Sequence, residues 1–157
     1  MLLRQYHDEE YGRKKHGDAA LFEKLCLECF QAGLSWRTVL YKRDALRECF
    51  YSFDAARVAA MTEDDVAALM GDARIIRCRR KMEAVIHNAQ RHLVLFPEEG
   101  SFSAYVYEHS SGEALSADLK RLGYRFAGPV ICEAFLMSVG ATEGHEPQCF
   151  MAGVSGE

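Results

Sequence analysis

The sequence predicts an all-α protein whose 157 residues form one compact domain. Three observations support this fold class. Apolar residues recur at helical spacing along most of the chain, capping residues and glycine or proline stops separate these segments, and no segment shows the period-2 alternation of a half-buried strand. The length is also sufficient to bury a real core without disulfide staples.

The first two helices are predicted from their capping residues. Asp18 is expected to cap a helix that runs to Gly33, because glycine suits the left-handed position that ends a helix. Ser35 is expected to open a second helix that continues through Cys49. These two helices would be joined by a connection of only a few residues.

The middle of the chain is predicted to contain three more helices. Asp54 would open a short one, and Thr62-Glu63-Asp64-Asp65 resembles a capping box before the next. Gly71 and Asp72 would end that helix. A long helix is then expected from about Arg77 to Leu95, with Pro97 just beyond its end.

Three shorter helices are expected in the remaining sequence. The first covers Ser101–His109 and is followed by a polar loop at residues 110–112. The second covers Ala114–Leu122 with Gly123 as its stop, and the third is the apolar stretch Pro129–Val139.

Composition excludes several classes of protein. No apolar run approaches the roughly 20 residues that span a bilayer, and the charged N-terminus lacks a signal-peptide pattern. We therefore expect a cytoplasmic protein with no membrane contact, and we expect a monomer. The six cysteines lie mostly in apolar helical stretches and are interpreted as reduced core residues. A net charge of −4 means that any binding to nucleic acid would depend on a local basic patch.

The most informative segment places an acid within an apolar helical stripe. Leu21, Leu25, Glu28 and Ala32 fall at i, i+4, i+7 and i+11, so they share one helix face. An unpaired buried carboxylate costs several kcal/mol or takes up a proton, so it usually has a partner or a function. On this stripe alone, a rim glutamate paired with a nearby Arg or Lys is favoured over a functional one. Trp36, the only tryptophan in the chain, follows shortly after.

A basic hairpin between two helices forms a second candidate site, at about residues 62–90. A tight turn at a helix N-terminus exposes backbone N–H groups and the positive end of the helix dipole, which suits a phosphate. The basic residues that gather at this turn are Arg74, Arg77, Arg79, Arg80 and Lys81. The alternative interpretation is a solvated basic helix start.

Two further sets of residues have open interpretations. His145 and Cys149 form an H-x3-C spacing that zinc sites use, and His7 could join them in a clasp between the chain ends, although this spacing often arises by chance. Tyr6, Tyr11 and Trp36 offer faces on which a base could stack, but aromatic residues are more often part of a core.

Taken together, these segments resemble the 3-methyladenine DNA glycosylase I (Tag) family of the helix-hairpin-helix superfamily. The resemblance covers almost the whole chain, and the matching segments occur in the family's order. They are residues 6–12 (YHDEEYG), 26–28 (CLE) with 31–36 (QAGLSW), 72–77 (DARIIR) with Lys81, 119–129 (LKRLGYRFAGP), and His145 with Cys149. The sequence departs from the family at Tyr11, where a tryptophan is usual.

The resemblance implies a single helical domain that acts on alkylated double-stranded DNA. Such an enzyme flips the damaged nucleotide out of the duplex and hydrolyses its glycosidic bond. Glu28 would be the catalytic-site carboxylate that contacts the cationic base, while Trp36 and Tyr6 would stack on it with help from Tyr11. The residues expected to hold DNA phosphates are Arg74, Arg77 and Lys81.

The resemblance also implies a zinc clasp. Three of the family's four ligands would be His7, His145 and Cys149, whereas the fourth, an N-terminal cysteine, has no counterpart in this sequence. Zn²⁺ with three protein ligands and a water, or a site without metal, are both consistent with this set. No organic cofactor is implied.

Two other functions remain open at this point. The chain could be a divergent family member that binds DNA or a damaged base without efficient catalysis. It could also be a zinc-clasped interaction domain whose basic patch binds an acidic protein. Glu28 and Trp36 favour a base pocket over the interaction domain.

Overall fold

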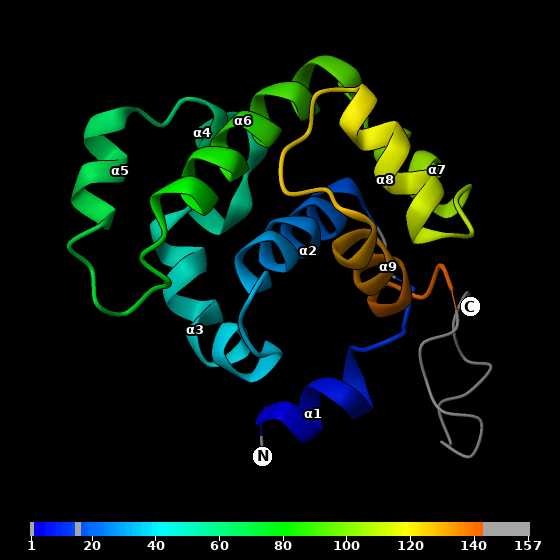
Figure 1. Ribbon diagram of the computed structural model, residues 1–157, viewed down its shortest axis with the longest axis horizontal. Helices are drawn as coiled ribbons and strands as arrows, with labels where there is room; N and C mark the ends of the chain where they lie inside the picture. The colour runs from blue at the N-terminus through cyan, green and yellow to red at the C-terminus, as the bar shows by residue number, and fades with distance from the viewer. Residues whose placement is uncertain (1, 15–16, 143–157) are drawn as a thin grey trace.

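The computed structural model describes residues 2–14 and 17–142, and within them all regular structure is helical. This confirms the predicted all-α, single-domain fold (Figure 1). Every helix in this part of the chain is too short or too polar to cross a bilayer. The elements are α1 (Leu2–Glu9), α2 (Asp18–Gln31), α3 (Trp36–Cys49), the 3-10 turn η1 (Tyr51–Phe53), α4 (Ala55–Ala59), α5 (Glu63–Leu69), α6 (Arg79–Leu95), α7 (Ser101–Tyr107), α8 (Gly112–Arg121) and α9 (Pro129–Ser138).

Helix α2 forms the centre of the fold. Helices α3, α6, α7 and α9 all pack against it, and Figure 1 shows it enclosed by its neighbours. Ten of its 14 residues are buried, so it carries apolar side chains on more than one face, as expected for a core helix. Lys24 and Glu28 are among these buried residues, and they therefore bring two charged groups into the interior.

Three predicted caps are confirmed. The Ser35 side chain accepts a hydrogen bond from the Thr38 backbone N–H at the start of α3. Asp54 caps α4 in the same way. Thr62 and Asp65 form the reciprocal capping box that opens α5. These local signals placed the helix starts correctly because each cap is formed by residues within the same turn.

The prediction that Asp18 caps its own helix is wrong. The N-cap of α2 is Gly17, and Asp18 is the first residue of the helix and is buried. Its carboxylate instead accepts hydrogen bonds of 3.1, 3.1 and 2.9 Å from the backbone N–H groups of Gly100, Phe102 and Ser103. Asp18 thus caps α7, more than 80 residues away in the sequence.

Some helix boundaries also differ from the prediction. The long helix α6 begins at Arg79 rather than Arg77, because Cys78 is its extended N-cap. Helix α7 ends at Tyr107, and α8 begins at Gly112. Helix α1 and the turn η1 were not predicted; both are short, with eight and three residues, and only Tyr6 of α1 is buried.

Gly112 allows α8 and α9 to pack closely. A Cβ atom at this position would lie 2.5 Å from the backbone nitrogen of Glu133 on α9, which is too close for any side chain. The Gly112 N–H also donates to the Glu133 carboxylate over 2.7 Å. The close approach and this hydrogen bond hold the start of α8 against α9. Helix α9 in turn contributes two residues to the pocket described next.

Candidate functional site

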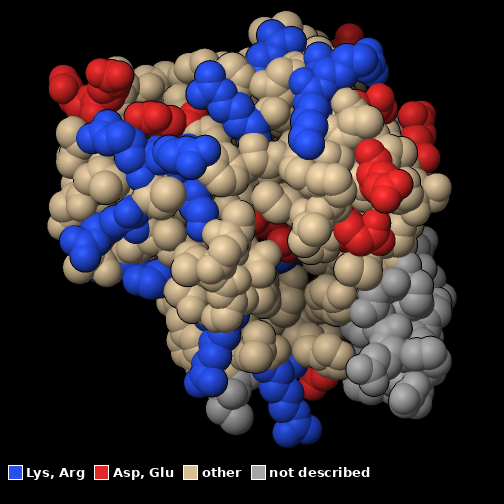
Figure 2. Space-filling view, in the orientation of Figure 1, with Lys and Arg blue, Asp and Glu red and all other residues tan. Residues whose placement is uncertain are grey.

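A pocket of about 200 Å³ lies where α1, α2, α3 and α9 meet. It is lined by Tyr6, Tyr11, Glu28, Gln31, Trp36, Ala134 and Met137. The structure thus brings together all four residues that the sequence assigned to base binding and catalysis. Figure 2 shows a hollow near the centre of the face, in the area where Figure 1 places α2 and α9.

Aromatic rings form one side of this pocket. Tyr6 is buried on α1, and its ring centroid lies 5.2 Å from that of Trp36 and 6.1 Å from that of Tyr11. Burial, with the neighbouring Glu28 carboxylate, raises the pKa of the Tyr6 hydroxyl far above its usual value, so this hydroxyl keeps its proton at all physiological pH values. The rings provide flat apolar faces of a size that suits a planar heterocycle.

The acidic group of the pocket is already paired. Glu28 Oε1 lies 3.2 Å from Lys24 Nζ, one helical turn earlier on α2. The Lys24 side chain is 4% exposed and the Glu28 side chain 5%. Burial raises the pKa of the Glu28 carboxyl, and the Lys24 ammonium opposes that rise. The same ammonium lies 3.3 Å from the Trp36 ring centroid and 4.9 Å from that of Tyr6.

Lys24 is a residue that sequence reasoning missed. The sequence favoured an interpretation in which Glu28 is paired with a nearby Arg or Lys at the rim of the core. The structure shows such a pair, with Lys24, but the pair is buried. The signal was available, since a lysine four residues before a glutamate lies on the same helix face. Gln31 was also detectable in this way, whereas Ala134 and Met137 come from α9 and no local pattern connects them to α2.

A basic surface lies beside α6. Figure 2 shows Lys and Arg side chains over the left part of this face, above α6 and the connection that precedes it. Arg77, Arg79, Arg80 and Arg125 are all exposed there. Arg79 pairs loosely with Glu83 at 3.7 Å, and within the described residues no carboxylate pairs with Arg77 or Arg80. These exposed arginines at the start of a long helix form a surface suited to phosphates.

Arg74 is held by acidic neighbours. Its guanidinium lies 2.8 Å from Asp72 and 2.9 Å from Glu48. These carboxylates raise the pKa of Arg74 and the arginine lowers that of Asp72, so both groups are charged. Asp72 also accepts the backbone N–H of Arg74, which organises the turn between α5 and α6. Because half of its side chain is exposed, Arg74 can still meet a phosphate, at the expense of these ion pairs.

The structure does not support a phosphate contact for Lys81. This residue is buried, and its ammonium donates to the backbone carbonyls of Phe30 and Ala32 at the end of α2. Its pKa is lowered by burial. The sequence placed Lys81 with the basic hairpin because it follows Arg80 directly, but its side chain turns into the interior toward the end of α2. Lys81 caps the C-terminus of α2 and so supports the connection that precedes Trp36.

The predicted metal ligands are only partly within the described residues. His7 lies on α1 with its side chain 47% exposed, and its Nδ1 is 3.0 Å from the Asp8 carboxylate. His145 and Cys149 lie outside the described residues. In the part that is described, no three His, Cys, Asp or Glu side chains are grouped to hold a metal. The zinc clasp therefore stays a prediction.

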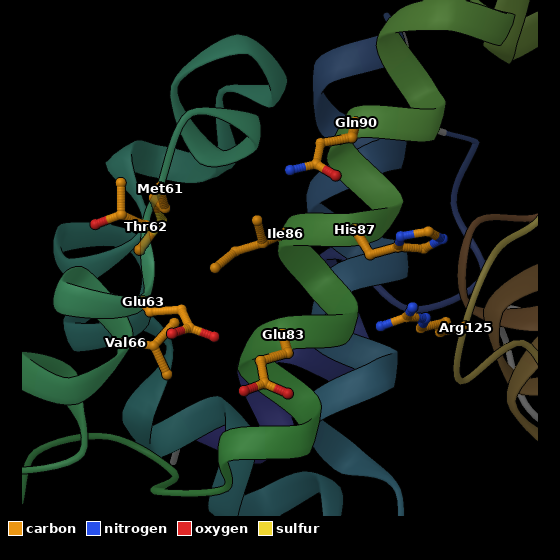
Figure 3. A pocket seen from close by; sticks show the side chains of 9 residues that line it. All are labelled: Met61, Thr62, Glu63, Val66, Glu83, Ile86, His87, Gln90 and Arg125. Carbon is orange, nitrogen blue, oxygen red and sulfur yellow. The ribbon is translucent and has the colours of Figure 1, made fainter.

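A second hollow lies between α5 and α6 and has a different character. Its volume is about 250 Å³, and Figure 3 shows Glu63 and Glu83 entering it from the two helices. His87 and Arg125 lie along its other side. Its described lining contains no Phe, Tyr or Trp, so it lacks the stacking faces of the first pocket.

Comparisons with known proteins agree with this geometry. A sequence model of the family described as methyladenine glycosylase matches residues 1–114 and 108–152. The chain is 39% identical to DNA-3-methyladenine glycosylase 1 of Escherichia coli K12, over 92% of this chain and 88% of that protein. A crystal structure of 3-methyladenine DNA glycosylase I is similar with a TM-score of 0.90 at 37% identity, over 96% of this chain and 94% of that one. The Staphylococcus aureus glycosylase structure that addresses 3-methyladenine recognition has a TM-score of 0.89 at 33% identity, over 96% and 91%.

Proposed function

The chain belongs to the methyladenine glycosylase family, and we infer that it is a DNA repair enzyme that releases 3-methyladenine from alkylated double-stranded DNA. The observation that carries this proposal is the pocket in which Glu28 meets the rings of Tyr6, Tyr11 and Trp36. The reaction is hydrolysis of the N-glycosidic bond after the damaged nucleotide has been flipped out of the duplex.

The chemistry of the lesion explains why such a pocket suffices. Methylation at N3 gives the base a positive charge while it is still attached to the sugar, so the base is already a good leaving group. The enzyme then needs to bind and orient the base more than to protonate it. Aromatic faces attract a cation, and the Glu28 carboxylate would accept a hydrogen bond from the hydrogen-bonding edge of the base. As the bond to the sugar breaks, its electron pair neutralises the base; water then adds to the sugar carbon and releases one proton to the solvent.

DNA would be held by the basic surface beside α6. Arg77 and Arg80 are exposed and would contact phosphates, while the backbone N–H groups at the start of α6 would donate hydrogen bonds to a phosphate oxygen. Arg74 would contribute only by exchanging its acidic partners for a phosphate. Such contacts fix the position of the duplex and read no sequence.

The test is release of free 3-methyladenine from duplex DNA treated with a methylating agent, measured by chromatography of the soluble fraction. We expect the purified protein to release the base and to leave undamaged DNA intact. Binding to alkylated DNA without any release would instead support the divergent member that binds and does not catalyse. Neither binding nor release, with or without added zinc, would contradict the proposed function.

We also propose that His7, His145 and Cys149 hold Zn²⁺ and join the two ends of the chain. The carboxylate of Asp8 beside His7 Nδ1 supports this, because metal-binding histidines usually bond their second ring nitrogen to a carboxylate or carbonyl. Bound zinc would act structurally. We expect about one zinc per chain by elemental analysis, and a lower unfolding midpoint after chelation. Protein that contains no zinc after refolding with the metal, and that a chelator leaves unchanged, would contradict this proposal.

The remaining expectations concern assembly and location. We propose a monomer, which light scattering coupled to gel filtration would test against the chain mass of 17.7 kDa. Because its substrate would be chromosomal DNA, the proposed location is the compartment that contains the chromosome, which is the cytoplasm in bacteria such as Escherichia coli.

A further inference from the structure

Lys24 places a positive charge next to the groups that would recognise a cationic base. Its ammonium lies 3.2 Å from Glu28 Oε1, 3.3 Å from the Trp36 ring centroid and 4.9 Å from the Tyr6 ring centroid. All three of these partners line the pocket, whereas Lys24 itself is almost completely buried and is not one of the lining residues. The ammonium therefore lies against the wall of the pocket and is shielded from solvent.

A carboxylate and two aromatic rings are the groups expected of a site for a cation. In this chain they already surround a cation that the protein supplies. With Glu28 ionised and Lys24 protonated, the pair contributes no net charge to the pocket. A base that carries a positive charge would have to share Glu28 and the two rings with the ammonium, whereas an uncharged base would not.

We propose that Lys24 is a specificity-determining residue that lowers the preference of this pocket for cationic bases and lets it accept uncharged alkylated purines. This inference rests on the proposed function, because it concerns the same base pocket. Lys24 lowers the affinity for bases that carry a positive charge. Stacking on Trp36 and Tyr6, in contrast, contributes to the binding of charged and uncharged bases alike.

The size of the effect is estimated with Coulomb's law for a base cation taken to lie about 5 Å from the Lys24 ammonium. Two like charges about 5 Å apart in a partly buried site, with an effective dielectric constant near 20, repel each other enough to change affinity by well over tenfold. Even if relaxation and water remove part of this repulsion, we expect replacement of Lys24 to change the preference between matched charged and uncharged ligands by at least about tenfold.

The experiment compares two ligands of the same shape. One is 3,9-dimethyladeninium, which carries the charge of the lesion in DNA. The other is its 3-deaza analogue, in which a carbon atom replaces the charged ring nitrogen. Trp36 is the only tryptophan in the chain, so its fluorescence reports binding to this pocket directly. Titrations at about pH 8.5, several units above the ordinary pKa of a glutamate, favour the ionised form of Glu28, because burial raises the pKa of this carboxyl and the variants lack the ammonium that opposes the rise.

The variants remove the charge in two ways. Lys24→Met replaces the side chain by an apolar one of similar length, and Lys24→Gln keeps an amide that can still bond to Glu28. The control is Lys120→Met, which removes an exposed lysine on α8. Thermal unfolding of each protein identifies the variants that are folded, and either folded Lys24 variant is sufficient for the test.

We expect wild type to bind both ligands, and a folded Lys24 variant to favour the cation over its 3-deaza analogue at least tenfold more than wild type does. The Lys120→Met variant should keep the wild-type ratio. An unchanged ratio in both Lys24 variants, with binding intact, would overturn the role of Lys24 and leave the proposed function standing. If wild type binds neither ligand and also releases no base from DNA, the base pocket itself is wrong and this inference falls with it.

Discussion

Glu28 is subject to two opposing influences. Burial raises the pKa of its carboxyl, and the Lys24 ammonium 3.2 Å away lowers it. The sequence could predict that an acid on an apolar helix face needs a partner, because an isolated buried carboxylate is costly. The i, i+4 spacing offers Lys24 as a candidate partner, but a lysine has a long flexible side chain that reaches solvent as readily as the interior. Only the packing of Trp36 and Tyr6 over the ammonium decides the matter.

His92 on α6 illustrates how burial affects a titratable side chain outside the pocket. Its ring lies 4.4 Å from Phe22 and 4.7 Å from Phe102, measured between centroids, and its Nδ1 is 3.4 Å from the Tyr124 hydroxyl. Burial lowers the pKa of His92 to about 4, and the nearby Asp18 only partly opposes this. The imidazole is therefore neutral in the folded protein at neutral pH.

This burial predicts a pH-dependent stability. The unfolded chain binds a proton at His92 below about pH 6.5, whereas the folded chain does so only near pH 4, so the free energy of unfolding falls as the pH drops through this window. The contribution of His92 is present above about pH 6.5 and amounts to about 3 kcal/mol when fully lost. Urea unfolding at several pH values would measure it.

The matched variant for this prediction is His92→Gln, which cannot titrate in this range. It should be less stable than wild type at pH 7, and its stability should fall less steeply between about pH 6.5 and 4. If both proteins lose stability with the same slope, His92 does not titrate as described.

Helix ends were predictable where the cap is local and not where it comes from another helix. Ser35, Asp54 and Thr62 cap the turns that they begin. Asp18 and Lys81 instead satisfy the ends of α7 and α2, respectively, from distant parts of the chain. Side-chain type alone does not distinguish these cases, because the same carboxylate or ammonium can cap its own helix, cap another helix or face solvent.

The two basic residues at the start of α6 should behave differently when replaced. Arg77→Ala should weaken binding to undamaged duplex and reduce the slope of log affinity against log salt by about one, with little change in stability. Lys81→Met should lower the free energy of unfolding by about 2 kcal/mol, because the buried Phe30 carbonyl and the partly buried Ala32 carbonyl lose their donor. Fluorescence anisotropy over a salt series and urea unfolding would measure these effects.

This pair of variants also tests whether Lys81 caps α2 or contacts the DNA backbone. If Lys81→Met reduced the salt slope as Arg77→Ala does while leaving stability unchanged, Lys81 would be a phosphate ligand after all. If Arg77→Ala left the salt slope unchanged, the basic hairpin would not hold the DNA backbone.

The contact between α8 and α9 predicts an effect at a single glycine. Gly112→Ala would place a methyl group 2.5 Å from the Glu133 backbone, so the two helices must separate or distort. We expect a loss of about 2 kcal/mol or more in unfolding free energy, as for other overpacked sites, together with weaker base binding because α9 carries Ala134 and Met137.

Gly71→Ala is the matched control for this change. A Cβ atom there would lie 3.4 Å from the nearest atom, the Ala68 carbonyl oxygen, and the residue is not in a left-handed conformation. The free energy of unfolding of the Gly71→Ala variant should stay within about 0.5 kcal/mol of that of wild type. Equal stability of the two variants would show that α8 and α9 are not packed as described.

At the scale of the whole molecule, the pocket is assembled from distant parts of the chain. Tyr6 and Tyr11 come from the region of α1, Glu28 and Trp36 from α2 and α3, and the apolar floor from α9 (Figure 1). The sequence pattern predicted the helices and the acid on a buried face. Only the family resemblance connected Tyr6 and Tyr11 to that acid, because nothing in a single helical period specifies which distant helices will meet.

The proposed role of this pocket is to bind the damaged base and to excise it from DNA. The most direct measurement is single-turnover release of 3-methyladenine from methylated duplex DNA by wild type, Glu28→Gln and Trp36→Ala, with Glu98→Gln as an exposed glutamate control. Loss of a charge-assisted hydrogen bond in Glu28→Gln should slow release about 10- to 100-fold, Trp36→Ala should also slow it through lost stacking, and the control should match wild type. Release by both pocket variants at the wild-type rate would show that Glu28 and Trp36 do not form the base-binding site.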